Sequence, residues 1–231
     1  ENMVKEMETI TSPKTGPDRT EEIDMNARPA TCSIDTVLFD FGGVLAEEGF
    51  ANGLRTIARN HGLDDNEFLE LARELIDSTG YLTGRANESA YWQAVRDRTR
   101  VAQSDEELRN EILSRFVLRP FMFDIVRKLK RSGVRVAILS DQTNWLDELD
   151  ATLDFFTLFD AVYNSYHLGK SKADGSHFPE IVARMKDIPE RVLFIDDNDG
   201  HCQRARDAGL NAIRYTGRDA FEKEFALYCR L

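Results

Sequence analysis

Residues 36–43, with the sequence TVLFDFGG, decide the fold of this chain. Apolar and β-branched residues lead up to a single carboxylate, Asp40, and two glycines close the segment. A short apolar run that glycines terminate is typical of a strand buried on both faces, as in the centre of a parallel sheet. Asp40, near the end of such a strand, is therefore the first candidate for a functional residue.

Three further apolar runs follow, at residues 134–140, 191–196 and, more weakly, 211–215. Helical patterns separate these runs; one begins at Pro120, where a first-turn proline fits, and another ends at Gly209. Strands that alternate with helices imply a parallel sheet with right-handed crossovers. We therefore predict a doubly wound, Rossmann-like α/β core.

About 90 residues between the first two runs contain no comparable strand. Helical spacing recurs there at residues 53–60, 67–77, 88–98 and 105–116, and Asn87 and Ser104 are suitable N-caps. The pattern predicts a helical-bundle cap at residues 47–117, inserted into a core formed by residues 34–46 and 118–231. Residues 1–33 lack an apolar period and hold three prolines, which predicts a flexible N-terminal tail.

Composition restricts the class of protein. Of the 231 residues, 30 are Lys or Arg and 41 are Asp or Glu, a net charge of −11. This balance argues against nucleic-acid binding and against an anionic membrane surface, although a local pocket can still bind a phosphorylated small molecule. No apolar run approaches the ~18 residues of a membrane span, and no signal peptide is recognisable. We expect a cytoplasmic protein, and the sequence does not indicate its oligomeric state.

The chain has three cysteines, Cys32, Cys202 and Cys229, and none of them forms a CxxC pair. An odd, small number of cysteines without such spacing is typical of reduced thiols. We therefore expect neither a disulfide nor a zinc site.

Polar side chains stand at the ends of three predicted strands. Asp40 ends the first run, Ser140 the second, and Asp196 and Asp197 the third. Because the carboxyl ends of parallel strands meet at one edge, where ligands bind, these side chains should converge. Carboxylates that close repel one another unless a cation lies between them, and a hard divalent ion with oxygen ligands, Mg²⁺, meets that need.

Four segments in this order resemble the motifs of the haloacid dehalogenase superfamily of phosphohydrolases. They are residues 39–45, residues 138–141, residues 165–178 with Gly169 and Lys172, and residues 194–198. The resemblance implies a hydrolase with a small helical cap. Among its members, this chain is similar to sugar-phosphate phosphatases, including enzymes for glucose 1-phosphate.

The resemblance also implies roles for individual residues. Asp40 would be the nucleophile that forms an aspartyl-phosphate, and Lys172 would neutralise the charge that develops in the transition state. Ser140 and backbone N–H groups near Asp141 would hold the phosphoryl oxygens. Mg²⁺ would be held by a set of oxygen ligands from Asp40, the carbonyl of Gly42, Asp196 and Asp197.

One position departs from the usual pattern of active phosphatases in this superfamily. They carry a second Asp two residues after the nucleophile as general acid and base, and here that residue is Gly42. Such a group contributes ~10²–10⁴ in rate. His167, His177 and Asp141 are possible replacements. Lys170 is an alternative to Lys172, which the spacing after Gly169 favours.

The leading hypothesis is a Mg²⁺-dependent phosphatase that acts on a small phosphorylated metabolite, with a sugar phosphate as the favoured class. A non-catalytic protein that binds phosphate or Mg²⁺ is the main alternative, because Gly42 removes a key group. A haloacid dehalogenase with Asp40 as nucleophile is a further alternative, against which the paired acids Asp196 and Asp197 speak.

Overall fold

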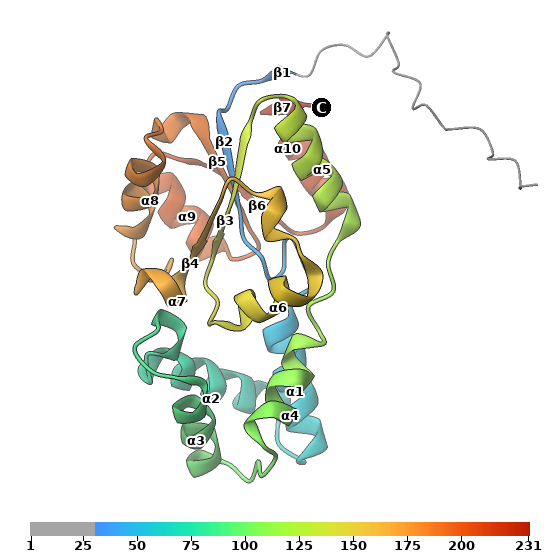
Figure 1. Ribbon diagram of the computed structural model, residues 1–231, viewed down its shortest axis with the longest axis vertical. Coiled ribbons are helices and arrows are strands. Elements are labelled where there is room, and N and C mark those ends of the chain that lie inside the picture. Colours follow the sequence, from blue (N-terminus) through green and yellow to red (C-terminus); the bar gives the residue numbers. More distant parts are fainter. Residues whose placement is uncertain (1–30) are drawn as a thin grey trace, which may run out of the picture.

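The computed structural model describes residues 31–231. Its centre is a five-stranded parallel sheet in the order β4-β3-β2-β5-β6, which confirms the predicted doubly wound α/β core (Figure 1). The strands are β2 (Thr36–Phe39), β3 (Arg135–Ser140), β4 (Ala161–Asn164), β5 (Val192–Asp196) and β6 (Asn211–Arg214). The strand order reverses at β2, which lies between β3 and β5. The ends of β2 and β5 therefore adjoin at the switch point, where open α/β sheets bind ligands.

The edge strand β4 has no counterpart among the predicted strands. Three of its four residues are only half-buried, whereas every residue of β2 and β5 is buried. A short edge strand of this kind lacks the continuous apolar run that marks a central strand. It forms because β3 supplies a complete row of backbone partners along the whole of its length.

Alternate side chains of the strands join two separate apolar layers. In β2, Val37 and Phe39 belong to one cluster and Leu38 to the other. Helices α5 (Pro120–Arg131), α6 (Trp145–Leu153) and α10 (Arg218–Phe225) cover the first side, and α8 (His177–Met185) and α9 (Asp199–Asp207) cover the second. This arrangement explains why the strands read as unbroken apolar runs, since both faces of each strand are buried.

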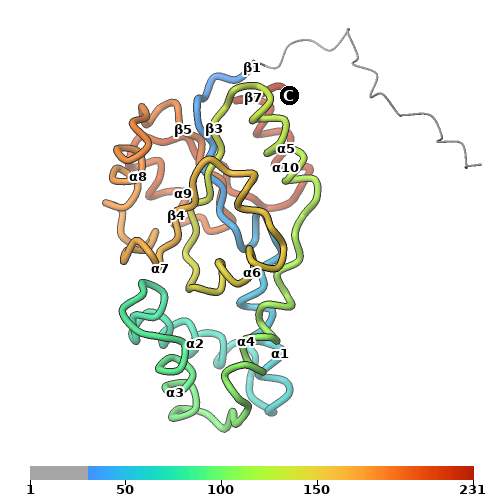
Figure 2. Tube along the Cα trace, in the orientation of Figure 1, coloured from blue at the N-terminus to red at the C-terminus, as the bar shows by residue number. Residues whose placement is uncertain are grey.

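The inserted helices stand as a separate layer below the carboxyl edge of the sheet (Figures 1 and 2). They are α1 (Gly49–Asn60), α2 (Asp65–Ser78), α3 (Glu88–Arg98) and α4 (Asp105–Leu113), with a 3₁₀ turn η1 (Tyr81–Thr83) after α2. Both expected N-caps form, because the Asn87 side chain accepts from Ala90 N and Ser104 makes a capping box with Glu107. The helical character predicted for this part of the chain is confirmed.

The cap is fastened to the core on the side of η1. The Tyr81 hydroxyl donates to Asn144 Oδ1 (2.7 Å), and Ser165 Oγ donates to Leu82 O (2.9 Å). Trp145 of the core packs among cap aromatics that include Tyr91 and Trp92, and all three are fully buried. Tyr91 and Trp92 therefore belong to the core of this junction.

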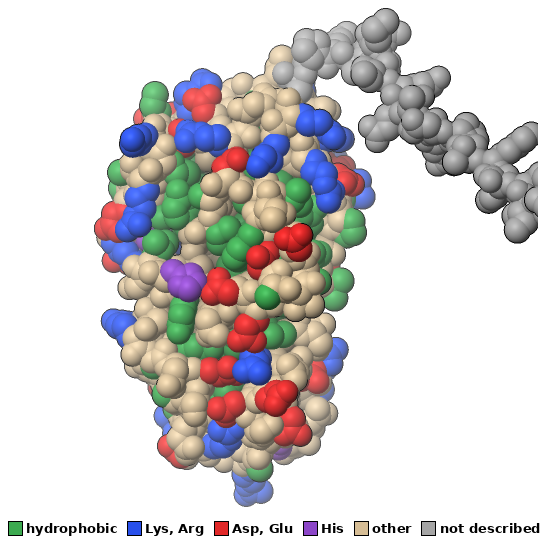
Figure 3. Space-filling model, in the orientation of Figure 1, with side chains coloured by type: hydrophobic (Ala, Val, Ile, Leu, Met, Phe, Trp, Pro, Cys, Tyr) green, Lys and Arg blue, Asp and Glu red, His purple; other side chains and the backbone are tan. Residues whose placement is uncertain are grey.

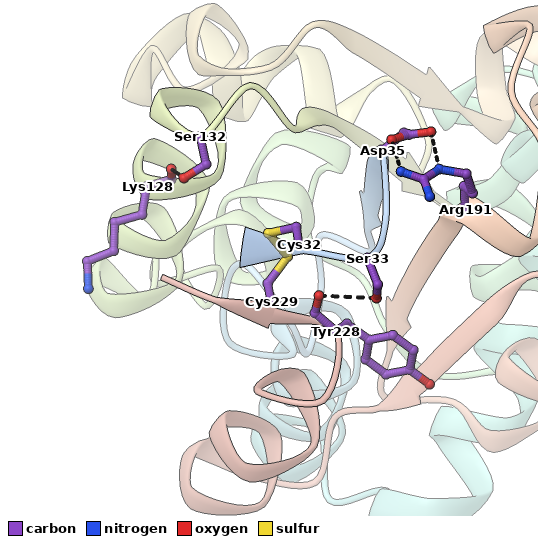
Figure 4. The surroundings of a disulfide bond; sticks show 8 residues. All are labelled: Cys32, Ser33, Asp35, Lys128, Ser132, Arg191, Tyr228 and Cys229. Carbon is purple, nitrogen blue, oxygen red and sulfur yellow. Dashed lines mark hydrogen bonds and ion pairs between the residues drawn. A yellow bond between two sulfur atoms is a disulfide. The ribbon is translucent and has the colours of Figure 1, made fainter. Parts of the chain in front are cut away.

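The two ends of the described chain meet at the opposite edge of the sheet. β1 (Thr31–Cys32) pairs antiparallel with β7 (Cys229–Arg230), and Cys32 forms a disulfide with Cys229 (Figure 4). The prediction that these cysteines are reduced thiols is wrong, because a separation of 197 residues hides a pairing that only the fold creates. Because disulfides are rare in cytosolic proteins, this bond does not support the expected cytoplasmic location.

Within the described residues, regular structure begins at residue 31, three residues before the predicted start of the core at residue 34. Residues 31–33 fall within the predicted tail, yet Thr31 and Cys32 are in β1, and Ser33 N donates to Tyr228 O (2.9 Å). Residues 1–30, the rest of that predicted tail, lie outside the described residues.

No helix among residues 31–231 combines the length and the apolar character that crossing a membrane requires. Charged side chains occur over the core and the cap on the face shown in Figure 3. Lys and Arg are frequent there toward the end that carries β1 and β7, and Asp and Glu toward the cap.

Candidate active site

Asp40 lies directly after β2, and one of its oxygens is held by three donors. Oδ1 accepts from Phe41 N (2.8 Å), from Ser140 Oγ (2.9 Å) and from Lys172 Nζ (3.0 Å). Residues 31–231 provide no hydrogen bond to Oδ2. The carboxylate is therefore fixed in orientation through one oxygen, which leaves the other available for a ligand or for chemistry.

Lys172 is fully buried and bridges two carboxylates. Its Nζ lies 2.6 Å from Asp196 Oδ2 and 3.0 Å from Asp40 Oδ1. Burial by itself would lower the pKa of Lys172, but the charges of Asp196 and Asp40 outweigh it and raise that pKa above its ordinary value. The lysine is therefore an ammonium ion at neutral pH.

The backbone around Lys172 is fixed from two sides. Its N–H donates to both oxygens of Asp141 (2.9 and 3.1 Å), and its carbonyl accepts from Arg204 Nε (2.7 Å). Lys170, the alternative lysine, donates to Glu180 Oε1 (2.6 Å) and to Ser176 Oγ. The structure thus places Lys172, and not Lys170, against Asp40.

Asp196 and Asp197 end β5, the strand beside β2. Asp196 is fully buried, and its carboxylate accepts from Asn198 N (2.7 Å) and contacts His201 Nδ1 (3.2 Å). Burial raises the pKa of Asp196, but Lys172 and His201 together outweigh burial through their charges and hydrogen bonds, so that pKa lies below its ordinary value. The half-buried Asp197 has a raised pKa because of burial and the adjacent charge of Asp196.

The carboxylates of Asp40, Asp196 and Asp197 form a cluster suited to a hard metal ion. Each offers an oxygen, and these oxygens lie within 4.8 Å of one another. Burial is the main cause that raises the pKa of Asp40, with Asp196 and Asp197 adding to it against Lys172. Three acidic groups therefore face one ammonium, and the negative charge left over, on oxygen ligands only, fits Mg²⁺.

Gly42 has no side chain to act as acid or base. A Cβ on this residue would lie 3.3 Å from Phe116 Cε1 and 3.8 Å from Gln142 Nε2. Of the replacements considered, only Asp141 lines the pocket that contains Asp40. His167 binds Asp147 at the surface (2.7 Å), and His177 is buried away from that pocket's wall.

All the predicted site residues line one pocket of about 460 Å³ at this edge of the sheet. It is lined by Asp40, Gly42, Ser140, Asp141, Lys172, Asp196 and Asp197. Sequence reasoning missed several other lining residues, which are Glu48, Arg73, Gln142, Asn198, Asp199, Gly200, His201 and Arg214. Proximity to the motifs could have indicated Gln142 and His201, but nothing in the sequence marks the cap residues Glu48 and Arg73.

Solved structures with a similar fold come from hydrolases. A HAD family enzyme from Bacteroides thetaiotaomicron is 20% identical, with a TM-score of 0.68 over 83% of this chain and 98% of that one. The same enzyme has been crystallised with magnesium and inorganic phosphate. An L-2-haloacid dehalogenase from Xanthobacter autotrophicus is 18% identical, with a TM-score of 0.60 over 84% of this chain and 83% of that one. At these identities the likeness shows the fold alone.

Matches are also found at the level of sequence. A drimenol cyclase from Aspergillus calidoustus is 30% identical over 71 residues, which are 31% of this chain and only 13% of that protein. The chain therefore spans a small part of this curated relative. The sequence model of the haloacid dehalogenase-like hydrolases matches residues 34–209, which include every site residue predicted from the sequence. The chain belongs to the haloacid dehalogenase-like hydrolases.

Proposed function

We propose that this protein is a Mg²⁺-dependent phosphatase that hydrolyses a small phosphorylated metabolite through an aspartyl-phosphate on Asp40. The observation that carries the proposal is the position of Asp40, oriented through Oδ1 by Ser140 and Lys172 beside a further pair of carboxylates. Phosphoryl transfer needs a positioned nucleophile and positive charge around the phosphoryl oxygens, and this pocket can supply both. The magnesium and phosphate complex of a structural neighbour is in keeping with the proposal.

Each polar residue of the pocket has a distinct part in this mechanism. Asp40 Oδ2, free of hydrogen bonds from the described residues, attacks phosphorus. The hydroxyl of Ser140 turns from Asp40 to a phosphoryl oxygen, and backbone N–H groups at Asp141 bind the other oxygens. Lys172 neutralises the charge that develops there, and Asp141 holds the backbone of Lys172 in place.

Mg²⁺ would be held by Asp40, Asp196 and Asp197 together with the carbonyl of Gly42. When bound, it supplies positive charge that allows an anionic substrate to approach an anionic nucleophile. Lys172 keeps the apo cluster partly neutral, because it contacts Asp40 and Asp196 directly.

A sugar phosphate is the substrate class that we favour. The pocket volume of about 460 Å³ is in the ordinary range for small-molecule sites, and the lining is mostly polar. Arg73 of the cap and Arg214 at the end of β6 add positive charge beyond the carboxylates. An anomeric phosphate also suits a site without an acid at residue 42, because its leaving group needs less protonation.

Release of p-nitrophenol from p-nitrophenyl phosphate tests the proposal. The wild type should turn over with Mg²⁺ and stop with EDTA, and Asp40→Asn and Lys172→Met should reduce the rate by at least about 100-fold. Lys170→Met is the matched control, because Lys170 binds Glu180 outside the pocket, and it should keep the wild-type rate.

Three other outcomes would contradict the proposal of a phosphatase that acts through Asp40. Chloride release from 2-chloropropionate without metal would indicate the dehalogenase. Binding of Mg²⁺ and phosphate without any turnover would indicate the non-catalytic alternative. Turnover that survives Asp40→Asn would place the chemistry on another residue.

A further inference from the structure

The side-chain amide of Gln142 lies next to the position that a side chain at residue 42 would take. Its Nε2 is 3.8 Å from the position that a Cβ on Gly42 would take. Gln142 is 8% exposed and lines the pocket of Asp40, and residues 31–231 offer no hydrogen bond to its amide. Its amide atoms are open to the pocket rather than sealed in the interior, so a ligand or a water can reach them.

The loop that carries Gln142 is held rigidly. Its backbone carbonyl accepts from Ser165 Oγ (3.1 Å), and the next carbonyl, of Thr143, accepts from Asn164 Nδ2 (2.9 Å). These contacts attach the loop after β3 to the end of β4. The amide is therefore presented to the pocket from a fixed backbone.

Several other polar groups of the pocket have partners within residues 31–231. Both oxygens of Asp141 accept from Lys172 N, and His201 Nδ1 contacts Asp196. Glu48 caps helix α1 by accepting from Ala51 N (2.9 Å). Gln142 differs from these three residues because its amide lies near Gly42 and has no hydrogen-bond partner among the described residues.

We propose that Gln142 orients the water that hydrolyses the aspartyl-phosphate on Asp40, an inference that rests on the proposed function. The amide oxygen accepts a hydrogen bond from the water, and Nε2 donates to a phosphoryl oxygen. A glutamine does not ionise, so it positions the water without taking its proton. An amide has the same task toward the attacking water in GTPases.

The step balances without an added base. The water oxygen attacks phosphorus, the bond between phosphorus and the Asp40 oxygen breaks, and its electron pair returns to the carboxylate. Both protons of the water remain on the phosphate, which leaves as the monoanion. The acyl phosphate is itself activated, so an oriented water is sufficient.

In the preceding step, formation of the aspartyl-phosphate, no side chain at residue 42 assists the leaving group. Asp40 displaces a leaving group that takes the electron pair of its bond to phosphorus, and nothing at Gly42 protonates it. The substrates are therefore phosphates with a stable leaving anion, such as anomeric, enol or aryl phosphates. Simple alkyl phosphates are poor substrates.

Rapid-mixing kinetics with p-nitrophenyl phosphate separate the two steps. In Gln142→Leu, which keeps the volume and removes the amide, a burst of about one p-nitrophenol per site should precede a steady rate about 100-fold below wild type. The burst also reports a folded site. Gln142→Glu should restore the steady rate, because a carboxylate can also hold the water. Gln203→Leu is the matched control, since the Gln203 amide donates to Asp207 at the surface.

The inference is overturned if Gln142→Leu shows no burst, or if its steady rate equals that of wild type. Those results differ from failure of the proposed function, in which the wild type itself has no turnover that depends on Asp40.

Discussion

At the scale of single residues, the balance of charge around Lys172 determines both stability and chemistry. A buried ammonium between two buried carboxylates is held by mutual attraction, and removal of one partner leaves uncompensated charge in the interior. Lys172→Met should therefore lower the free energy of unfolding by about 3–5 kcal/mol in EDTA. Lys170→Met should change it by less than about 1 kcal/mol, because Lys170 makes partly exposed ion pairs.

Urea unfolding of the two variants measures this difference. Added Mg²⁺ should recover part of the loss in Lys172→Met, since a cation then again lies among the carboxylates. An equal effect of the two substitutions would contradict the assignment of Lys172 to the buried cluster.

Gly42 offers a second prediction at this scale. Gly42→Asp should raise turnover of alkyl phosphates by at least about 10-fold relative to p-nitrophenyl phosphate, because it supplies a proton donor for the leaving group. Contact with Phe116, 3.3 Å from the new Cβ, is tight, so the variant should be made with and without Phe116→Leu. An unchanged ratio of the two rates in both backgrounds would show that proton donation does not limit this enzyme.

At the scale of elements, the buried histidine that begins α8 makes the stability of the fold depend on pH. His177 is 2% exposed, its Nε2 has no partner among the described residues, and burial holds its pKa below the ordinary value. A folded-state pKa below the unfolded value of about 6.5 means that the unfolded chain binds the proton more readily. This contribution to stability is complete above pH 6.5 or so and is lost as the pH falls toward the folded-state pKa.

His177→Gln should flatten this part of the pH profile. The expected result is a smaller loss of unfolding free energy between about pH 7 and pH 5 than in wild type, measured by urea titration at each pH. His167→Gln is the control, because its ring lies at the surface against Asp147. A profile that His177→Gln leaves unchanged would show that the buried ring is not the titrating group.

Helices and strands also differ in how well they can be predicted from their sequences. The central strands are predictable because burial on both faces leaves unbroken apolar runs, and the helices α3 and α4 because their N-caps are local. The edge strand β4 is not, because three of its residues are half-buried and its pairing with β3 is set by the neighbouring strand.

At the scale of the whole molecule, the disulfide between Cys32 and Cys229 closes almost the entire described chain into a loop. Closing a loop with a sequence separation of 197 residues reduces the entropy of the unfolded chain, a stabilisation of about 5 kcal/mol in the chain-entropy model. Reduction, or Cys229→Ser, should therefore lower the thermal midpoint. The p-nitrophenyl phosphatase rate below that midpoint should not change, because β1 and β7 lie at the edge opposite the cap (Figure 1).

Thermal unfolding of wild type and Cys229→Ser, each with and without dithiothreitol, tests this prediction. Dithiothreitol should lower the midpoint of wild type alone. A wild-type midpoint that does not respond to the reductant would mean that the bond does not contribute to stability.

The sequence by itself determined the α/β core and the inserted helices, and it predicted Asp40, Ser140 and Asp196 as site residues, a lysine at 170 or 172, and a missing acid at residue 42. The core and the residues at the strand ends follow from local apolar patterns and from the rule that parallel strands end at one edge, whereas the lysine and the missing acid follow from the resemblance to the family. Only the tertiary structure decided that Cys32 meets Cys229, that Lys172 rather than Lys170 reaches Asp40, and that Gln142 adjoins Gly42. Each of these contacts joins residues far apart in the chain, and no local pattern records such a contact because the packing of the whole fold creates it.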